Sequence, residues 1–124
     1  MDLSPTTTTK TVTRDKRWLA SQHGTDSTDT ITLDVAGGTF AAVLQEGGTV
    51  IPSGTPLNRG ADGFYDRASG ADVAEGHLFE DVIIKSTTTK AGAALLWHGE
   101  VVQAQLPAGS GFVDANRAPH IRYV

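Results

Sequence analysis

DTITLDV, residues 29–35, alternates polar and apolar side chains with a period of two. Successive side chains of a β-strand point to opposite faces, so this alternation predicts a strand with one buried face. Similar stretches recur about every eight to twelve residues, which is typical of an all-β barrel or sandwich. Residues 39–44, 50–51, 77–85, 94–106 and 120–124 make up these stretches.

Glycine and proline separate the expected strands. Gly-Gly pairs stand at 37–38 and 47–48, residues 52–56 read as a turn, and residues 58–74 read as a loop with Phe64 and Tyr65 as its bulky anchor. Asp114 can cap a single helical turn before Pro119, and no stretch has helical spacing over ten residues. We therefore expect an all-β fold, a small β-barrel or sandwich-like domain, with at most one short helix.

Composition narrows the function classes. The 124 residues suit one domain, and the absence of cysteine excludes disulfides, thiolate metal sites and cysteine nucleophiles. No run of 18 apolar residues predicts a membrane span, and the N-terminus resembles neither a signal peptide nor a lipidation site. We expect a soluble chain that is made inside a cell and has no membrane partner.

Charge divides the chain into two regions. Residues 1–17 carry a net charge of +2 and are rich in threonine, whereas residues 18–124 carry −6. Threonine favours extended backbone, and a segment this polar cannot offset its ordering entropy by burial. We predict an arm at 1–17, disordered in a free monomer and extended where a partner holds it, and a β domain at 18–124. The acidic body argues against a nucleic-acid partner, which would require a basic surface.

Candidate chemical sites are weak. His98 and Glu100 would share a strand face, but spacing suggests no third metal ligand. Asp26, Asp29 and Asp34 do not follow a calcium-loop pattern, and Ser110 lacks the strand-turn-helix context of a nucleophile. We expect no catalytic residue, no metal site and no cofactor. Trp97 is expected in the core, whereas Trp18 suits either a core position or an anchor at an interface.

Five motifs, in order, resemble those of the head decoration proteins of tailed phages. They are IPSGTPL (51–57), a Gly-Phe-Tyr loop (63–65), GHLFEDV (76–82), ALLWHGEVV (94–102) and Leu106-Pro107. The family is similar in plan to the phage lambda head decoration protein, although the Thr-rich basic arm differs from the Pro- and Ala-rich start of that protein.

The resemblance implies a small β-barrel or β-tulip-like domain with an extended N-terminal arm. It implies a structural virion protein that is made in the host cytoplasm, lies on the capsid exterior and has no enzymatic activity. It would bind the major capsid protein as a homotrimer, stabilise the expanded shell and use its arm for contact. The residues expected to contact the capsid are Thr7, Thr9, Lys10, Thr11, Val12, Thr13, Arg14, Lys16, Arg17 and Trp18.

Two other function classes remain open. A carbohydrate-binding β module on a virion or secreted protein would need a row of exposed aromatic side chains. The chain has eight aromatic residues, and most of them lie in apolar stretches. A small enzyme would need a nucleophile, a base and an orienting group, and the sequence offers no such set.

Overall fold

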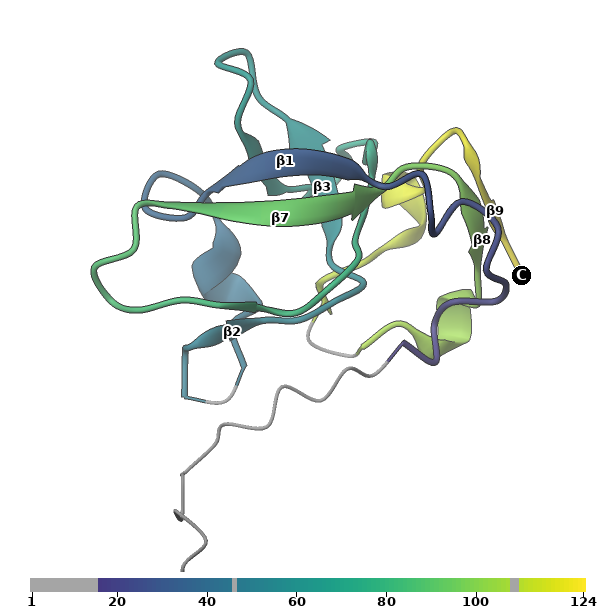
Figure 1. Ribbon diagram of the computed structural model, residues 1–124, viewed down its shortest axis with the longest axis horizontal. Coiled ribbons are helices and arrows are strands. Elements are labelled where there is room, and N and C mark those ends of the chain that lie inside the picture. Colours follow the sequence, from purple (N-terminus) through teal and green to yellow (C-terminus); the bar gives the residue numbers. More distant parts are fainter. Residues whose placement is uncertain (1–15, 46, 108–109) are drawn as a thin grey trace, which may run out of the picture.

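Five strands form a closed barrel in the computed structural model, which describes residues 16–45, 47–107 and 110–124 (Figure 1). The barrel order is β1 (Asp29–Asp34), β4 (Tyr65–Arg67), β3 (Pro56–Arg59), β5 (Gly76–Leu78) and β7 (Lys90–Leu96). β1 and β7 are antiparallel and pair from Asp29 opposite Leu95 to Asp34 opposite Lys90. β1 runs parallel to β4, with Leu33 opposite Tyr65 as their one register pair. The expected all-β fold with a small barrel is confirmed.

Two smaller sheets extend the barrel. β2 (Val50–Ile51) pairs antiparallel with β6 (Val82–Ile83), and β8 (Gly99–Val101) pairs parallel with β9 (Ile121–Tyr123). Two clusters of buried side chains form the core. One includes Ile31, Leu33, Phe40, Val43, Ile51, Leu57, Leu78, Ile84 and Leu95, and the other includes Trp18, Ala68, Ala74, Leu96, Val101, Ala118 and Ile121.

β1 follows the predicted alternation. Ile31 and Leu33 are buried in the first core cluster, whereas Asp29 and Thr30 are exposed. The expected turn at residues 52–56 is also present, because the Thr55 hydroxyl donates a hydrogen bond to the Pro52 carbonyl at 2.7 Å.

The expected strand at residues 39–44 is wrong. A 3₁₀ turn, η1 (Phe40–Ala42), takes its place. Phe40 and Val43 are both buried, and a helical turn puts residues three apart on one side, whereas a strand would put them on opposite faces. The turn is held from outside by Asp66, whose carboxylate accepts a hydrogen bond from the Thr39 backbone N–H at 2.7 Å.

Residues 58–74, expected as a loop, contain part of a hairpin. β3 and β4 are antiparallel, with Asn58 opposite Asp66 and Arg59 opposite Tyr65. The hairpin tip is a tight turn, where the Gly60 N–H bonds to the Phe64 carbonyl at 2.8 Å, and a second turn follows where the Asp72 N–H bonds to the Ser69 carbonyl at 3.1 Å.

Two long expected strands are each divided. Residues 77–85 split into β5, which pairs in the barrel, and β6, which pairs with β2. Residues 94–106 split into the end of β7, β8 and the 3₁₀ turn η2 (Gln103–Gln105). In both cases the chain moves from the barrel to a smaller sheet, so the apolar run continues while the pairing partner changes.

Helical structure is limited to single turns in the described residues. The turn expected after Asp114 is confirmed as η4 (Asp114–Asn116), and η1 and η2 add turns that the sequence pattern missed. None of the helices in these residues is long and apolar enough to cross a membrane.

Candidate functional site

The described domain begins at a tryptophan that is fully buried. Trp18 has no exposed surface, and its indole N–H donates a hydrogen bond of 3.2 Å to the Ser53 hydroxyl. The backbone from Trp18 onward pairs with β8 and the residue after it: the Val102 N–H bonds to the Trp18 carbonyl at 2.7 Å, and Leu19 forms a β-bridge with Val101. We call residues 16–20 the root. Its position and direction are set by a core side chain and by strand pairing.

Lys16, at the start of the root, contacts the domain rather than standing apart from it. Its ammonium group lies 2.6 Å from a Glu80 carboxylate oxygen and 3.9 Å from the centre of the Phe79 ring. The Leu19 N–H also bonds to the Lys16 carbonyl at 2.9 Å. Glu80 remains 44% exposed, so this ion pair contributes little to folding stability. The ion pair does fix the direction of the chain at Lys16.

The structure divides the expected contact residues into three groups. Lys16 is half-buried and paired with Glu80, and Arg17 is exposed. Trp18 is corrected from a contacting residue to a core residue, because a fully buried ring offers no surface to a partner. The remaining expected residues, which lie outside the described residues, are Thr7, Thr9, Lys10, Thr11, Val12, Thr13 and Arg14.

A buried polar network lies next to the root. His77 is fully buried, with Nδ1 2.7 Å from the Gly54 carbonyl oxygen and Nε2 2.7 Å from the Tyr123 hydroxyl. A carbonyl oxygen only accepts, so Nδ1 carries the proton and the Tyr123 hydroxyl donates to Nε2. The same hydroxyl accepts the Ala118 N–H at 2.9 Å. The network therefore joins the turn at 52–56, β5 and β9 through one neutral imidazole.

Burial sets the protonation state of this network. Desolvation lowers the pKa of His77 from its ordinary value of 6.5 to about 4, against a smaller opposite effect of the Gly54 carbonyl. Desolvation likewise raises the pKa of Tyr123 to about 12. Both groups are neutral near pH 7, so the network serves packing and orientation.

Sequence reasoning missed His77, Tyr123 and Asp81 as structural polar residues. The Asp81 carboxylate accepts the Ser53 N–H at 2.6 Å, which fixes the loop that covers Trp18. His77 and Tyr123 lie 46 residues apart, and no spacing signal links them. The available signal was the position of His77 and Asp81 in an otherwise apolar stretch, because buried polar groups need partners.

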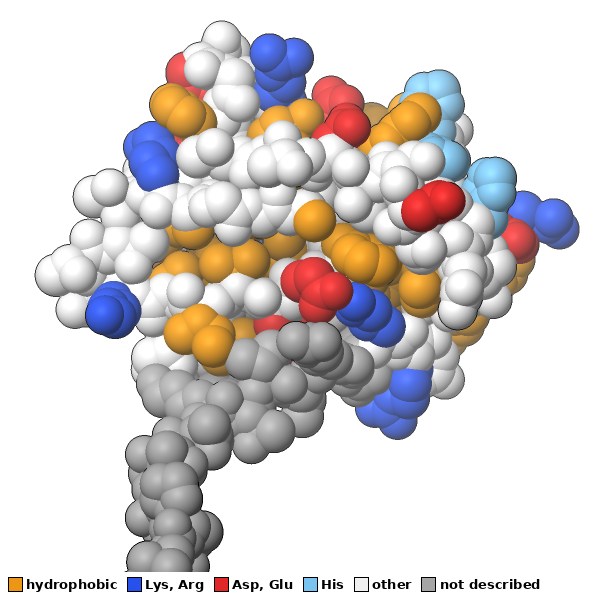
Figure 2. Space-filling view, viewed as in Figure 1, with side chains coloured by type: hydrophobic (Ala, Val, Ile, Leu, Met, Phe, Trp, Pro, Cys, Tyr) orange, Lys and Arg blue, Asp and Glu red, His pale blue; other side chains and the backbone are white. Residues whose placement is uncertain are grey.

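Trp97 stands between the first core cluster and a group of histidines. It is half-buried, so the expected core position holds for one side of its ring, and its indole N–H donates to the Ser27 carbonyl at 2.9 Å. The His98 and His120 rings pack edgewise on it at centroid distances of 4.2 and 5.9 Å. His23 adds to this group through an edge contact of 5.1 Å with His98. Figure 2 shows histidine side chains gathered at one end of the molecule.

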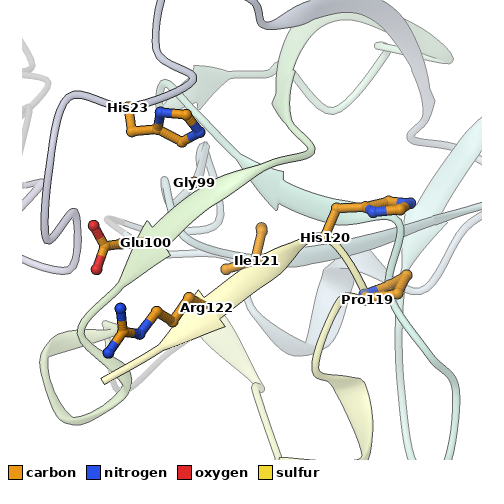
Figure 3. A pocket seen from close by; sticks show the side chains of 7 residues that line it. All are labelled: His23, Gly99, Glu100, Pro119, His120, Ile121 and Arg122. Atoms are coloured by element: carbon orange, nitrogen blue, oxygen red, sulfur yellow. The ribbon is translucent and has the colours of Figure 1, made fainter.

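A shallow cavity of about 520 Å³ opens beside these histidines (Figure 3). Glu100 of β8 and Arg122 of β9 are register neighbours and bring opposite charges to it, and His23 and His120 complete its rim. Among residues 16–45, 47–107 and 110–124, no group of three or more His, Asp or Glu side chains is placed to hold a metal ion. What the cavity does offer is a pair of opposite charges, Glu100 and Arg122, beside two imidazole rings.

The two regions differ in how firmly they are built. The root depends on buried contacts from loops far apart in the sequence, whereas the histidine group lies on the surface.

Comparison of the chain with protein-family models, with curated proteins and with solved structures gave no match in any of the three.

Proposed function

We propose that this protein is a capsid decoration protein, a structural virion component that binds the outside of a tailed-phage head. One observation carries the proposal: four of the five motifs that resemble the decoration family supply contacts around the root. Ser53 belongs to the first, Glu80 and Asp81 to the third, and Val101 to the fourth. Leu106, in the fifth, packs against the core cluster of Trp18. These motifs hold the point from which the basic N-terminal segment departs.

A fixed root makes an attached segment more effective in binding. Ordering a residue costs roughly 1–2 kcal/mol, and this cost has already been met for the root in the folded domain. The segment before it is rich in threonine and can add as a strand to an edge on the shell. Lys10 and Arg14 would attract acidic groups and increase the rate of encounter.

Stabilisation of the shell follows from selective binding. A protein that binds the expanded state of the shell and not its precursor shifts the equilibrium toward the expanded state. The proposed partner is the major capsid protein, with homotrimers of this chain on the capsid exterior. The proposed role is mechanical and needs no catalytic residue, cofactor, nucleic acid or membrane.

The carbohydrate-binding alternative gains no support from the described surface. Its large exposed hydrophobic residues are the aliphatic Val73, Ile83, Val113 and Val124. Tyr65 is a single ring beside a groove, and Trp97 is partly covered by histidines. A row of exposed rings suited to a sugar is thus lacking in the part of the chain that the structure describes.

Co-sedimentation with undecorated, expanded shells tests the proposal. The full chain should sediment with the shells, and deletion of residues 2–15 should abolish or greatly weaken binding while keeping Lys16 and Trp18 in place. Charge reversal by Lys10→Glu with Arg14→Glu should weaken binding most at low salt, whereas Lys85→Glu on the exposed body should not.

The outcomes distinguish the proposed function from the proposed role of the N-terminal segment. If the full chain fails to sediment with any expanded shell, the proposed function is wrong. If the truncated chain binds as well as the full chain, the protein still decorates shells but the body makes the contact. Thermal unfolding of each variant shows that the domain remains folded.

A further inference from the structure

The side of β1 that faces β4 is largely unpaired. On its other side, β1 pairs with β7 along its whole length. Toward β4 there is one register pair, Leu33 with Tyr65, and no strand in the described residues pairs there with Asp29–Thr32. Backbone groups of a strand point alternately to its two sides, so this stretch directs peptide groups toward an empty edge.

A groove of about 370 Å³ runs along this edge. It is lined by Asp29, Thr30, Ile31 and Thr32 of β1 and by Arg59, Gly63 and Tyr65 of the β3–β4 hairpin. The hairpin stands off from β1 in Figure 1. Its tip is closed by the Gly60 N–H bond to the Phe64 carbonyl, and Lys90 of β7 lies 4.9 Å from the centre of the Phe64 ring. Both walls of the groove therefore belong to hydrogen-bonded elements.

The edge carries little of the protection that normally blocks strand addition. Exposed edges are usually protected by charged side chains, proline, a bulge or short length. This edge is short and has one charged residue, Asp29, which is followed by Thr30, Ile31 and Thr32, all β-branched and favourable to extended pairing. The groove leaves these three residues open to an added strand.

The groove presents carboxylates to a segment that would enter it. Asp29 of β1 and Arg59 of β3 line it with opposite charges, and Lys90 lies near the hairpin tip. Burial raises the pKa of the Tyr65 hydroxyl, and the negative charges of Glu75 and Asp29 add to that effect, while Arg59 opposes it. A basic extended segment would complement this surface.

We propose that the groove beside β1 accepts residues 6–13 of a second copy of this chain as an added strand. These residues are six threonines with Lys10 and Val12, and Arg14 follows them. Eight extended residues span about 26 Å, about twice the length of the four-residue edge. In Figure 1 the hairpin stands above β1 and the root lies below the barrel, so the root and the groove are on different sides of β1, which favours exchange between copies. The proposed function assigns the same residues to the shell, so we propose the exchange for free copies in solution, and the segment would leave the groove when its chain binds a shell; the exchange itself does not depend on the proposed function.

Disulfide trapping between different molecules tests this inference on the full chain. The chain has no cysteine, so single substitutions are specific. Thr30→Cys is placed in one chain, and one residue from 6 to 13 is changed to cysteine in a second chain that carries a longer tag. Directly opposed residues on paired strands have Cβ atoms about 4.5–5.5 Å apart, within reach of a disulfide after small shifts. Thr87→Cys, at an exposed loop threonine, is the matched control.

The expected result is a mixed disulfide dimer whose yield peaks at one position of residues 6–13, the residue directly opposite Thr30. The two positions beside that peak should fall to the level of the Thr87→Cys control, because their side chains point to the other face. Adding Thr8→Pro should reduce crosslinking to that control level, because proline removes a strand hydrogen-bond donor.

Two results would overturn the inference. Crosslinking to Thr30→Cys no greater than to Thr87→Cys would show that the groove does not take this segment. A chain carrying both cysteines that closes its disulfide within a monomer, with no mixed dimer, would show that the second copy is not involved. Neither result bears on shell binding, which co-sedimentation measures separately.

Discussion

The indole N–H of Trp18 donates a hydrogen bond of 3.2 Å to the hydroxyl of Ser53, which lies 35 residues away in the sequence. Both side chains are buried, and the Ser53 N–H is bonded in turn to the Asp81 carboxylate. The first core residue of the described domain is thus tied to a turn that is itself tied to a third segment. The position of the root depends on this chain of contacts.

Ser53→Ala should lower the free energy of unfolding by about 1–3 kcal/mol, because it leaves the buried indole N–H without this acceptor. Denaturant unfolding followed by tryptophan fluorescence measures the change. Ser86→Ala, at an exposed position, is the control and should change stability by less than about 0.5 kcal/mol. Equal stability of the two variants would contradict the importance of this hydrogen bond.

His77 should make the fold sensitive to mild acid. Its pKa in the folded chain is about 4, below the ordinary 6.5 expected in the unfolded chain. Between these values the unfolded chain binds a proton that the folded chain does not, so stability falls as pH drops from about 6.5 to 4 and is unaffected by this group above that window. The whole window corresponds to about 3 kcal/mol.

Unfolding free energies at pH 7 and pH 5 measure this effect. His77→Gln should make the unfolding free energy depend less on pH, even if it also lowers that free energy at pH 7. His120→Gln, at an exposed site, should leave the pH dependence unchanged. The role assigned to His77 is wrong if its variant and the unsubstituted chain lose stability equally between the two pH values.

Tyr123→Phe should destabilise the domain by about 2–3 kcal/mol. The substitution keeps the ring but removes the partner of both His77 Nε2 and the Ala118 N–H, and unpartnered buried groups are costly. Tyr65→Phe, in the open groove, is the matched control with a smaller expected change. Thermal unfolding at pH 7 distinguishes the two, and equal losses would refute the argument.

Gly54→Ala should cost more than Gly48→Ala, although both glycines have similar positive φ angles, +89° and +83°. Either change carries about 1–2 kcal/mol for placing alanine in the left-handed region. At Gly54 the new Cβ would also lie 2.9 Å from Pro107 Cδ and 3.3 Å from Trp18 Nε1, whereas at Gly48 it meets open space. Overpacking adds about 1–3 kcal/mol. Denaturant midpoints of the pair measure the difference, and identical midpoints would contradict it.

The sequence by itself determined the elements whose signal is local. Alternation in residues 29–35 predicted β1 and its buried Ile31 and Leu33, because a half-buried strand must alternate. Proline and glycine predicted the turn at 52–56, and the isolated Asp114 predicted the single turn of η4. The absence of a helical period was enough to predict the all-β class.

Only the tertiary structure decided where strands change partners and which polar groups meet. The apolar runs at 77–85 and 94–106 gave no sign of division, because a pattern of burial does not specify the strand that supplies the hydrogen bonds. The η1 turn depends on Asp66, and the state of His77 depends on Tyr123 and Gly54, which are all distant in the chain. Trp18 suited a core or an interface equally well in the sequence. Trp18 is buried because Ser53, β8 and the second core cluster pack around it. These residues are distant in the sequence, so the residues next to Trp18 do not reveal them.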